Sequence, residues 1–352
     1  MTGHTLIAGA GISGLSVALA LLQRGCGVTV LDRGATGAES SWAGGGILSP
    51  LLPWDYAEAV SALVLRSMAC YAGWVADIEA ASGLDAELWR CGMLALDVES
   101  PEQALAWCAA HGMAATGRDE GSIWLPDVAQ VRNPRLLAAL RAAVVKQGGV
   151  IREHCAASGV LTQSGRVTAV RTTTGIFAAD SVVLATGAWS GLGLAGLAAT
   201  PQIRPIRGQM LLFKLEPGVL NTVLFRHGLY LIPRRDGHVL VGSTIEDAGF
   251  DKTTDDATRQ RLHADAAALL PQLADIQPVR HWAGLRPGSP DNIPVIDRHP
   301  DFDNVFVNTG HFRYGVTMAP ASAELLASLM EGNTPALDSA PYRWQAAQAR
   351  RW

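Results

Sequence analysis

Hydrophobic and polar positions follow a regular order near the start of the chain. A short apolar run at 5–8 is followed by a stretch at 15–22 dominated by alanine and leucine, and a second apolar run occupies 28–31. Short continuous apolar runs are typical of buried parallel strands, and the longer stretch has the length of a helix. The pattern predicts strand, helix and strand, which is the first unit of a doubly wound α/β sheet.

The rest of the chain carries more elements of both kinds. Residues 33–53 are rich in glycine and serine and predict a long loop. Periodic apolar positions or capping signals predict helices at 55–82, 100–111, 133–146, 253–270 and 320–330. Apolar or alternating runs predict strands at 92–97, 149–153, 167–171, 181–185, 209–214, 229–234, 239–243 and 305–308. The pattern between 206 and 250 is therefore all-β, with a hairpin turn at 235–237.

Three glycines between the first strand and the first helix predict the ligand of this unit. Gly9 permits a sharp turn, Gly11 lets the backbone approach a pyrophosphate, and Gly14 lets the helix pack closely on the strand. Asp32 ends the second apolar run, where a carboxylate meets a ribose hydroxyl. The strand at 181–185 belongs beside the same ligand, so we predict a dinucleotide bound by a discontinuous domain. The alternative is a glycine-rich turn in an unrelated α/β unit.

Composition narrows the class of protein. The chain has 352 residues, of which 49% are hydrophobic and 17% charged, with a net charge of −4 and a pI near 6.1. This length predicts two domains or one large one, and the acidic balance argues against nucleic-acid partners. The five cysteines have irregular spacing without a C-x-x-C pair, which predicts neither disulfides nor a metal site. No apolar run approaches about 20 residues, so we expect no membrane span and a cytoplasmic protein.

Four blocks of sequence together resemble a known superfamily. They are Gly9-x-Gly11-x-x-Gly14, residues 41–45 (SWAGG), residues 185–190 (ATGAWS), and the paired motifs at 284–287 (GLRP) and 310–315 (GHFRYG). In this order and spacing they resemble the D-amino-acid oxidase superfamily of flavoenzymes. Within that superfamily the arrangement is most similar to the bacterial glycine oxidases of thiamine biosynthesis, and the blocks span nearly the whole chain.

The resemblance implies a mixed α/β (α+β) fold with two domains. One is a Rossmann-type FAD-binding domain with a parallel central sheet, and the other is a substrate domain built on an antiparallel sheet. The expected boundaries are 1–84, 134–205 and 281–352 for the FAD-binding domain, and 85–133 and 206–280 for the substrate domain. FAD is expected to be noncovalent, because relatives with covalent flavin use a C-terminal cysteine and the last cysteine here is Cys155.

The resemblance also assigns an activity and three substrate-binding side chains. It implies oxidation of an amine next to a carboxylate, with O2 as electron acceptor, H2O2 as product and a possible homotetramer. Arg286 matches the arginine that grips the carboxylate, Tyr230 the tyrosine that helps to hold it, and Arg313 a second arginine in the pocket. A planar guanidinium suits a carboxylate because it donates two parallel hydrogen bonds. The alternatives are a surface arginine, an ordinary strand aromatic and an ion-pair partner, respectively.

By the same resemblance a larger set of residues holds FAD. The set is Gly9, Gly11, Ile12, Ser13, Gly14, Asp32, Arg33, Ser40, Ser41, Gly44, Gly45, Ala157, Thr186, Gly187, Trp189, Gly310, His311, Phe312, Arg313, Tyr314, Gly315 and Val316. The expected step is hydride transfer from the substrate α-carbon to flavin N5, which needs no protein base. N–H groups of 310–316 and of the start of the helix at 320–330 are expected to stabilise the reduced flavin.

Several residues depart from the family pattern and leave the substrate open. Asp32 stands where glutamate is commoner, residues 44–47 (GGGI) replace an alanine-rich sequence ending in methionine, and Tyr314 stands where asparagine is expected. Glycine or a small N-substituted glycine is the leading substrate. The alternatives are a bulkier secondary amine or D-amino acid such as iminodiacetate, a quinone-linked dehydrogenase, and a flavin-binding module without activity. A diacid would suit three further basic residues whose alternative is exposure to solvent: Arg207, Arg226 and His227.

Overall fold

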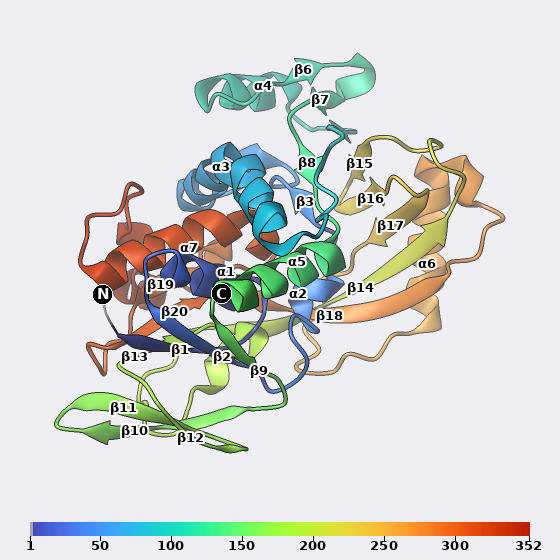
Figure 1. Ribbon diagram of the computed structural model, residues 1–352. Helices are drawn as coiled ribbons and strands as arrows, with labels where there is room; N and C mark the ends of the chain where they lie inside the picture. Colours follow the sequence, from blue (N-terminus) through green and yellow to red (C-terminus); the bar gives the residue numbers. More distant parts are fainter. Residues whose placement is uncertain (1–2) are drawn as a thin grey trace.

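The computed structural model describes residues 3–352 and contains two large sheets (Figure 1). The first has six strands in the order β19-β20-β13-β1-β2-β9. All neighbouring strands in it run parallel except β19 and β20. The strands are β1 (His4–Ala8), β2 (Gly27–Leu31), β9 (Val150–Arg152), β13 (Ser181–Leu184), β19 (Val295–Arg298) and β20 (Val305–Thr309). The strand predicted at 181–185 therefore lies directly beside β1, as expected.

Both faces of this sheet are buried, which explains the continuous apolar runs. Ile7 packs into a core shared with the helices, whereas its neighbours Leu6 and Ala8 pack into a second core on the opposite face. The helices are α1 (Ile12–Leu22), α5 (Asn133–Lys146) and α7 (Gly315–Glu331), with α3 (Glu58–Ser82) packed on α5 and α7. The opposite face is covered by the antiparallel strands β10 (Ala157–Gln163), β11 (Arg166–Thr172) and β12 (Gly175–Ala178), below the parallel sheet in Figure 1.

The second sheet has eight strands in the order β18-β14-β17-β16-β15-β5-β7-β6. Its neighbours are antiparallel except β15 and β5. Helix α6 (Asp256–Leu269) packs on one face, and α4 (Pro101–Ala110) lies near β6. The strands are β5 (Met93–Ala95), β6 (Thr116–Gly117), β7 (Ile123–Leu125), β14 (Arg204–Lys214), β15 (Val223–Arg226), β16 (Leu229–Pro233), β17 (His238–Gly242) and β18 (Arg280–Gly288). The expected combination of a parallel and an antiparallel sheet is confirmed.

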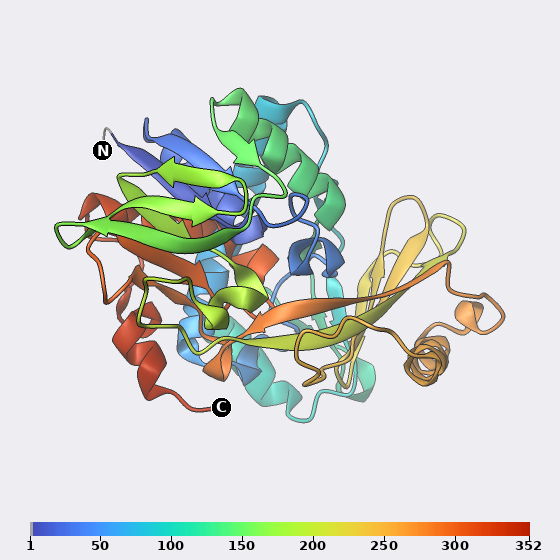
Figure 2. The same cartoon turned by 90° about the horizontal axis from the view of Figure 1, so that it is seen from below.

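Two long strands connect the two halves of the molecule. β14 and β18 pair from Arg204↔Gly288 to Leu212↔Arg280 and run from the centre of the molecule to α6 in Figure 2. Most of β18 falls in the segment 281–352, which the family resemblance predicts to belong to the FAD-binding domain, yet its hydrogen bonds are made in the eight-stranded sheet. The predicted domain boundaries stay a prediction. Smaller elements are α2 (Ser40–Ala43), α8 (Trp344–Ala349) and the sheet of β3 (Ile47–Leu48), β8 (Ala129–Gln130) and β4 (Trp89–Arg90).

The last long helix begins earlier than the sequence predicts. The sequence predicts a helix that starts at Pro320, but α7 begins at Gly315 and contains Pro320 in its interior. A proline removes the hydrogen bond to the carbonyl four residues before it. Here the hydroxyl of Tyr71 on α3 donates to that carbonyl, Val316 O, at 3.0 Å. The tertiary contact replaces the missing bond, so the helix continues through the proline.

Two other predicted helices begin later than expected. The helix predicted at 55–82 begins at Glu58, after a short 3-10 turn at Pro53–Asp55. The helix predicted at 253–270 begins at Asp256, because the side chain of Asp255 accepts from the N–H of Thr258 at 2.8 Å and caps its first turn.

Helix α3 is long and apolar enough to cross a membrane by length and composition, with a mean hydropathy of 1.4. In this structure it packs against α7 and α5. Val60, Leu63, Val64 and Ile78 on that side are fully buried. These contacts are those of a core helix.

Candidate active site

The turn after β1 is built on glycines that tolerate no side chain. Gly9 has a φ of +111°, and a Cβ there would lie 2.2 Å from the carbonyl oxygen of Ala185. A Cβ on Gly14 would lie 1.8 Å from the carbonyl oxygen of Gly9. Gly9 therefore allows β1 to end against the end of β13, and Gly14 allows α1 to start against the same turn. These are the roles expected of a turn that brings backbone close to a phosphate.

The carboxylate of Asp32 closes this turn from the end of β2. Its Oδ2 accepts from the N–H of Ala10 at 2.7 Å, and its Oδ1 accepts from the N–H of Gly34 at 2.8 Å. Burial raises the pKa of Asp32, and the two N–H donors act against that rise. The next residue, Arg33, stacks at 3.3 Å on the ring of Trp189. The aspartate thus fixes the edge at which a ribose is expected.

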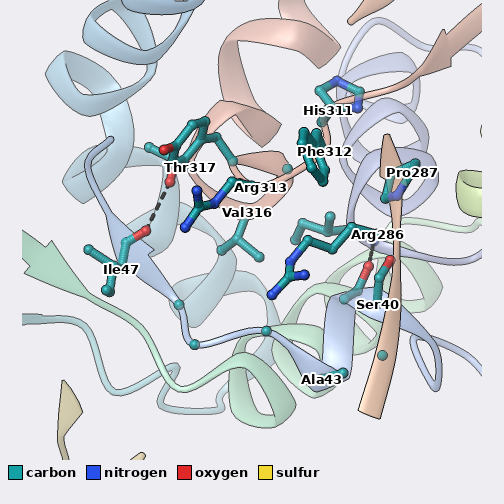
Figure 3. Close-up of a pocket in the computed structure, with 18 of the residues that line it drawn as sticks. Ser40, Ala43, Ile47, Arg286, Pro287, His311, Phe312, Arg313, Val316 and Thr317 are labelled. Atoms are coloured by element: carbon teal, nitrogen blue, oxygen red, sulfur yellow. Dashed lines mark hydrogen bonds between the residues drawn. The ribbon is translucent and has the colours of Figure 1, made fainter. Parts of the chain in front are cut away.

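A cavity lies where α1, the segment after α2, the start of α7 and the eight-stranded sheet meet (Figure 3). Three stretches of chain form most of its wall, at 11–13, 40–51 and 311–317. The eight-stranded sheet contributes Gly208, Met210, Tyr230, Gly284, Arg286 and Pro287. The guanidinium groups of Arg286 and Arg313 point into the same space in Figure 3. No aspartate or glutamate of the described chain lines it.

Arg286 is the best-anchored cation of this cavity. Its Nη2 donates to Ser243 Oγ at 2.6 Å, and its Nη1 donates to the carbonyl oxygen of Thr244 at 3.1 Å. Its guanidinium packs on the bare backbone of Gly208, where a Cβ would lie 2.3 Å from both terminal nitrogens. Burial lowers the pKa of Arg286, and the charge of Arg313 acts in the same direction. The group has no carboxylate partner among residues 3–352, which leaves its charge for an incoming anion.

The tyrosine predicted to help Arg286 lies beside it. Tyr230 is carried by β16, is 8% exposed and lines the cavity. Its ring packs near the bare backbone of Gly242, and its hydroxyl lies 4.0 Å from Met210 Sδ. Burial lowers the pKa of Arg286 and Tyr230 acts against that fall, so the two groups lie on the sheet side of the cavity as neighbours.

His311 lies on the opposite side of the cavity, against the start of α1. It is 1% exposed, its Nδ1 lies 3.4 Å from Ser13 Oγ, and its Nε2 is buried without a hydrogen-bond partner among the described residues. Burial lowers the pKa of His311 to about 4, so the ring is neutral near pH 7. A neutral imidazole with one unused nitrogen is suited to a hydrogen bond with a bound ligand.

Tyr314, where the family pattern led us to expect asparagine, pairs with a second tyrosine. Its hydroxyl hydrogen-bonds that of Tyr56, and the two rings meet edge to face at 5.0 Å. Tyr314 is 3% exposed, and burial raises its pKa well above the usual value, so it stays protonated. Thr317 Oγ1 donates to the carbonyl oxygen of Ile47 at 2.9 Å nearby (Figure 3). These contacts tie the start of α7 to residues 47–56.

The cavity gathers most, but not all, of the predicted site residues. It is lined by Gly11, Ile12, Ser13, Ser40, Ser41, Gly44, Gly45, Tyr230, Arg286, His311, Phe312, Arg313, Tyr314, Gly315 and Val316. The predicted residues that do not line it are Gly9, Gly14, Asp32, Arg33, Ala157, Thr186, Gly187, Trp189 and Gly310. Most of these nine belong to β-strand ends or turns of the parallel sheet, on the side where the nucleotide half of a dinucleotide is expected.

The sequence reasoning missed several wall residues. They are Ala43, Gly46, Ile47, Ser49, Leu51, Ala185, Gly208, Met210, Gly284, Pro287 and Thr317. Gly208 lies just before the predicted strand at 209–214, so it gave no signal there; only the longer β14, which begins at Arg204, makes it a glycine inside a strand, which indicates close approach of another group. The basic residues proposed for a diacid are ion-paired away from the cavity. Arg207 binds Glu246 and Asp251, and Arg226 and His227 both contact Asp97.

Comparison with known proteins decides the family. Residues 4–329 match the family described as DAO, FAD dependent oxidoreductase. The chain belongs to this family. It is therefore an FAD-dependent enzyme, and the expected enzyme class and cofactor are confirmed.

Relatives within the FAD-dependent oxidoreductases match almost the whole chain. The glycine oxidase of Pseudomonas aeruginosa is 43% identical over 358 residues, which cover 97% of this chain and 98% of that protein. The bifunctional protein ThiO/ThiG of Nostoc sp. is 35% identical, and the match covers 94% of this chain and 53% of the length of ThiO/ThiG. The crystal structure of glycine oxidase from Geobacillus kaustophilus superposes with a TM-score of 0.90 at 26% identity, covering 97% and 98% of the two chains. The protein is thus glycine oxidase-like in sequence and in fold.

The residues of this oxidoreductase fit FAD. The turn at Gly9 and Gly14 admits backbone but no side chain, and in the cavity wall a Cβ on Gly45 would lie 2.4 Å from Ile232 Cδ1. His311, which lines the cavity, adds a buried Nε2 without a hydrogen-bond partner among the described residues. A diphosphate suits the turn because the N-terminus of α1 carries partial positive charge.

Proposed function

We propose that the protein oxidises glycine, or a small N-substituted glycine, to the imine, which water hydrolyses to glyoxylate and an amine. Electrons pass to O2, so one substrate, one O2 and one water give glyoxylate, ammonia or amine, and H2O2. One observation carries the proposal. Arg286 and Tyr230, from two strands of the sheet, face the loop 310–316 across a single cavity that contains no carboxylate of the described chain.

The roles follow from the geometry of these groups. Arg286 is held from behind by Ser243 and Thr244, so its fork is fixed to receive the substrate carboxylate in two hydrogen bonds. Tyr230 adds a neutral donor. FAD, when bound, supplies the acceptor for the hydride that leaves the α-carbon.

Proton management requires little from the protein. The titratable groups of the cavity are two arginines, two tyrosines and the neutral His311. None is a carboxylate base, so the amine proton is lost to solvent before the substrate reacts. Tyr314 is buried and stays bonded to the partly buried Tyr56, so its hydroxyl is not free to act as a base.

The alternative diacid substrate receives no support from the sheet side. Arg207 is held by two carboxylates, and Arg226 and His227 share a third, so none has charge to offer a second carboxylate. Similarity to the ThiO/ThiG proteins supports a role of the product in thiamine biosynthesis. A cytoplasmic homotetramer belongs to the same proposal, and its mass in solution is measured by light scattering.

The test is anaerobic reduction of the yellow protein by a panel of amines. Glycine and sarcosine are expected to bleach the flavin band fastest, with D-alanine slower and iminodiacetate slowest, and aerobic turnover is expected to release one H2O2 per glyoxylate. A protein that keeps its FAD and is bleached by none of the four contradicts the proposal. Bleaching without peroxide release in air, followed by turnover with a quinone, selects the dehydrogenase instead.

A further inference from the structure

We call residues 41–46 the glycine loop. The loop includes the end of α2 and leads into β3, and most of its residues line the cavity. Its carbonyl oxygens are taken by donors that do not line the cavity. Asn133 Nδ2 donates to Ser41 O at 2.8 Å, and Trp282 Nε1 donates to Ala43 O at 3.1 Å. The loop is therefore held through its carbonyl oxygens, by donors that lie outside the cavity.

The two glycines in the second half of the loop are held in the same way. Arg234 Nη2 donates to Gly45 O at 2.8 Å, and the N–H of Val131 donates to Gly46 O at 2.9 Å. The peptide between Gly45 and Gly46 is trans, so its C=O and N–H point in opposite directions. Since Gly45 O points to Arg234, which lies outside the cavity, the N–H of Gly46 points into the cavity. Among residues 3–352 this N–H has no hydrogen-bond acceptor.

Arg234 is an unusual residue to find in this position. It follows β16, is 4% exposed and forms no ion pair among the described residues. Its other donor, Nη1, binds Val131 O at 2.9 Å and the side-chain oxygen of Gln130. Burying a guanidinium on carbonyl oxygens alone is costly. Burial lowers the pKa of Arg234 to about 10, so it remains charged near neutral pH.

We propose that Arg234 is a positioning residue for the flavin. By holding Gly45 O, it turns the adjoining peptide so that the N–H of Gly46 is offered to an acceptor atom of bound FAD. The same guanidinium joins the loop to Val131 and Gln130, so the loop and the segment behind it move as one. The inference rests on FAD in this cavity and is independent of which amino acid is oxidised.

The test compares two neighbouring arginines in the holoenzyme. Arg234→Met removes the donor, and Arg235→Met is the matched control, because Arg235 is exposed, donates to Leu88 O at 3.0 Å and does not contact the glycine loop. We expect Arg234→Met to weaken FAD binding about tenfold, the effect of one lost hydrogen bond in a buried site. We also expect a fall of about 30 mV in the flavin midpoint potential, a tenfold change for a two-electron couple, because the reduced flavin carries the charge that this N–H stabilises.

Further measurements separate positioning from a general loss of structure. Arg234→Lys keeps the charge but not the fork, so it is expected to recover part of the FAD affinity and of the potential. A folded Arg234→Met with the FAD affinity and potential of Arg235→Met overturns the proposal. Should Arg234→Met fail to fold, amide exchange on the wild-type holoenzyme decides. Protection of the Gly46 N–H about a hundredfold above that of exposed Gly218 supports the proposal, and equal exchange overturns it.

Discussion

The two sheets of this protein prepare their ligand sites in different ways. On the parallel sheet, the turn at 9–14 presents backbone, and its glycines are dictated by contacts with a neighbouring strand end. On the antiparallel sheet, side chains from distant strands do the work, as Arg286 and Tyr230 come from β18 and β16. The first site is local in sequence and depends on the absence of side chains. The second depends on what lies behind each side chain.

The support behind Arg286 extends well beyond its direct contacts. Thr244, whose carbonyl accepts from Arg286, also hydrogen-bonds Glu246 through its hydroxyl. Glu246 in turn accepts from Arg207 at 2.5 Å and from Gln209 at 3.1 Å. Burial acts to raise the pKa of Glu246, but these donors hold it below its usual value. The guanidinium is thus the outermost member of a network of side chains, whereas the glycine turn is held by single side-chain acceptors, Asp32 for the N–H of Ala10 and Ser41 for that of Ile12.

The largest effect is expected at the glycine turn. Gly14→Ala places a Cβ 1.8 Å from the carbonyl oxygen of Gly9, which is backbone and cannot move aside. We expect a loss of about 3 kcal/mol or more in the free energy of unfolding and loss of FAD from the purified protein. Chemical denaturation and the flavin content measure the two.

Its control is the same exchange in open space on another helix. Gly73 is exposed on α3, and a Cβ there meets nothing within 4 Å. Gly73→Ala is expected to stabilise the protein by about 0.5–1 kcal/mol and to leave FAD bound. If the two alanine variants behave alike, steric closure does not explain the turn.

The second effect tests the side-chain site. Arg286→Met removes the guanidinium that receives the carboxylate. We expect kcat/KM for glycine to fall roughly a thousandfold, which corresponds to a loss of about 4 kcal/mol in transition-state stabilisation, while FAD is retained. Arg280 lies on the same strand but is exposed over Trp42, at 4.6 Å from its ring. Arg280→Met is therefore the matched control, expected to keep wild-type kinetics. Loss of FAD from Arg286→Met would contradict the assignment of substrate binding to the antiparallel sheet and of FAD binding to the glycine turn.

The same contrast explains what could be predicted from the sequence. Gly9, Gly14 and Asp32 were predictable because they form one motif of fixed spacing, although the contacts that require Gly9 and Asp32 come from other parts of the chain. Arg286 and Tyr230 entered only through family resemblance, since neither has a local signal. Their placement in one cavity agrees with that expectation, and their roles stay a prediction.

Other features could not be predicted because their causes are distant in sequence. Pro320 sits inside α7 only because Tyr71 satisfies the carbonyl that it leaves free. Arg234 follows the motif LYLIP and reads as a polar residue at a hairpin end, but its contact is with Gly45, far back in the chain. A local pattern contains neither contact.

The third effect concerns His311, whose side chain lies against the glycine turn at the start of α1. Burial lowers the pKa of His311 to about 4, below its ordinary 6.5. The unfolded chain therefore binds a proton between these values while the folded protein does not, so stability is complete above pH 6.5 and falls as the pH drops toward 4. We expect a loss of about 2 kcal/mol at pH 5 relative to pH 7.5. His311→Gln, neutral throughout, is expected to lack this part of the pH dependence in denaturation curves.

The smallest effect separates the position of Arg286 from its presence. Gly208→Ala puts a Cβ 2.3 Å from both terminal nitrogens of Arg286. These atoms end a flexible side chain, so the fold absorbs the methyl group and the free energy of unfolding should change by less than about 1 kcal/mol. The fork, however, has to leave the carbonyls of Thr244 and Arg207 that orient it. We expect KM for glycine to rise about tenfold with FAD affinity unchanged, because substrate binding needs the guanidinium in place and FAD binding does not. An unchanged KM would show that the charge of Arg286, wherever it lies in the cavity, is sufficient, and that the network behind it serves stability alone.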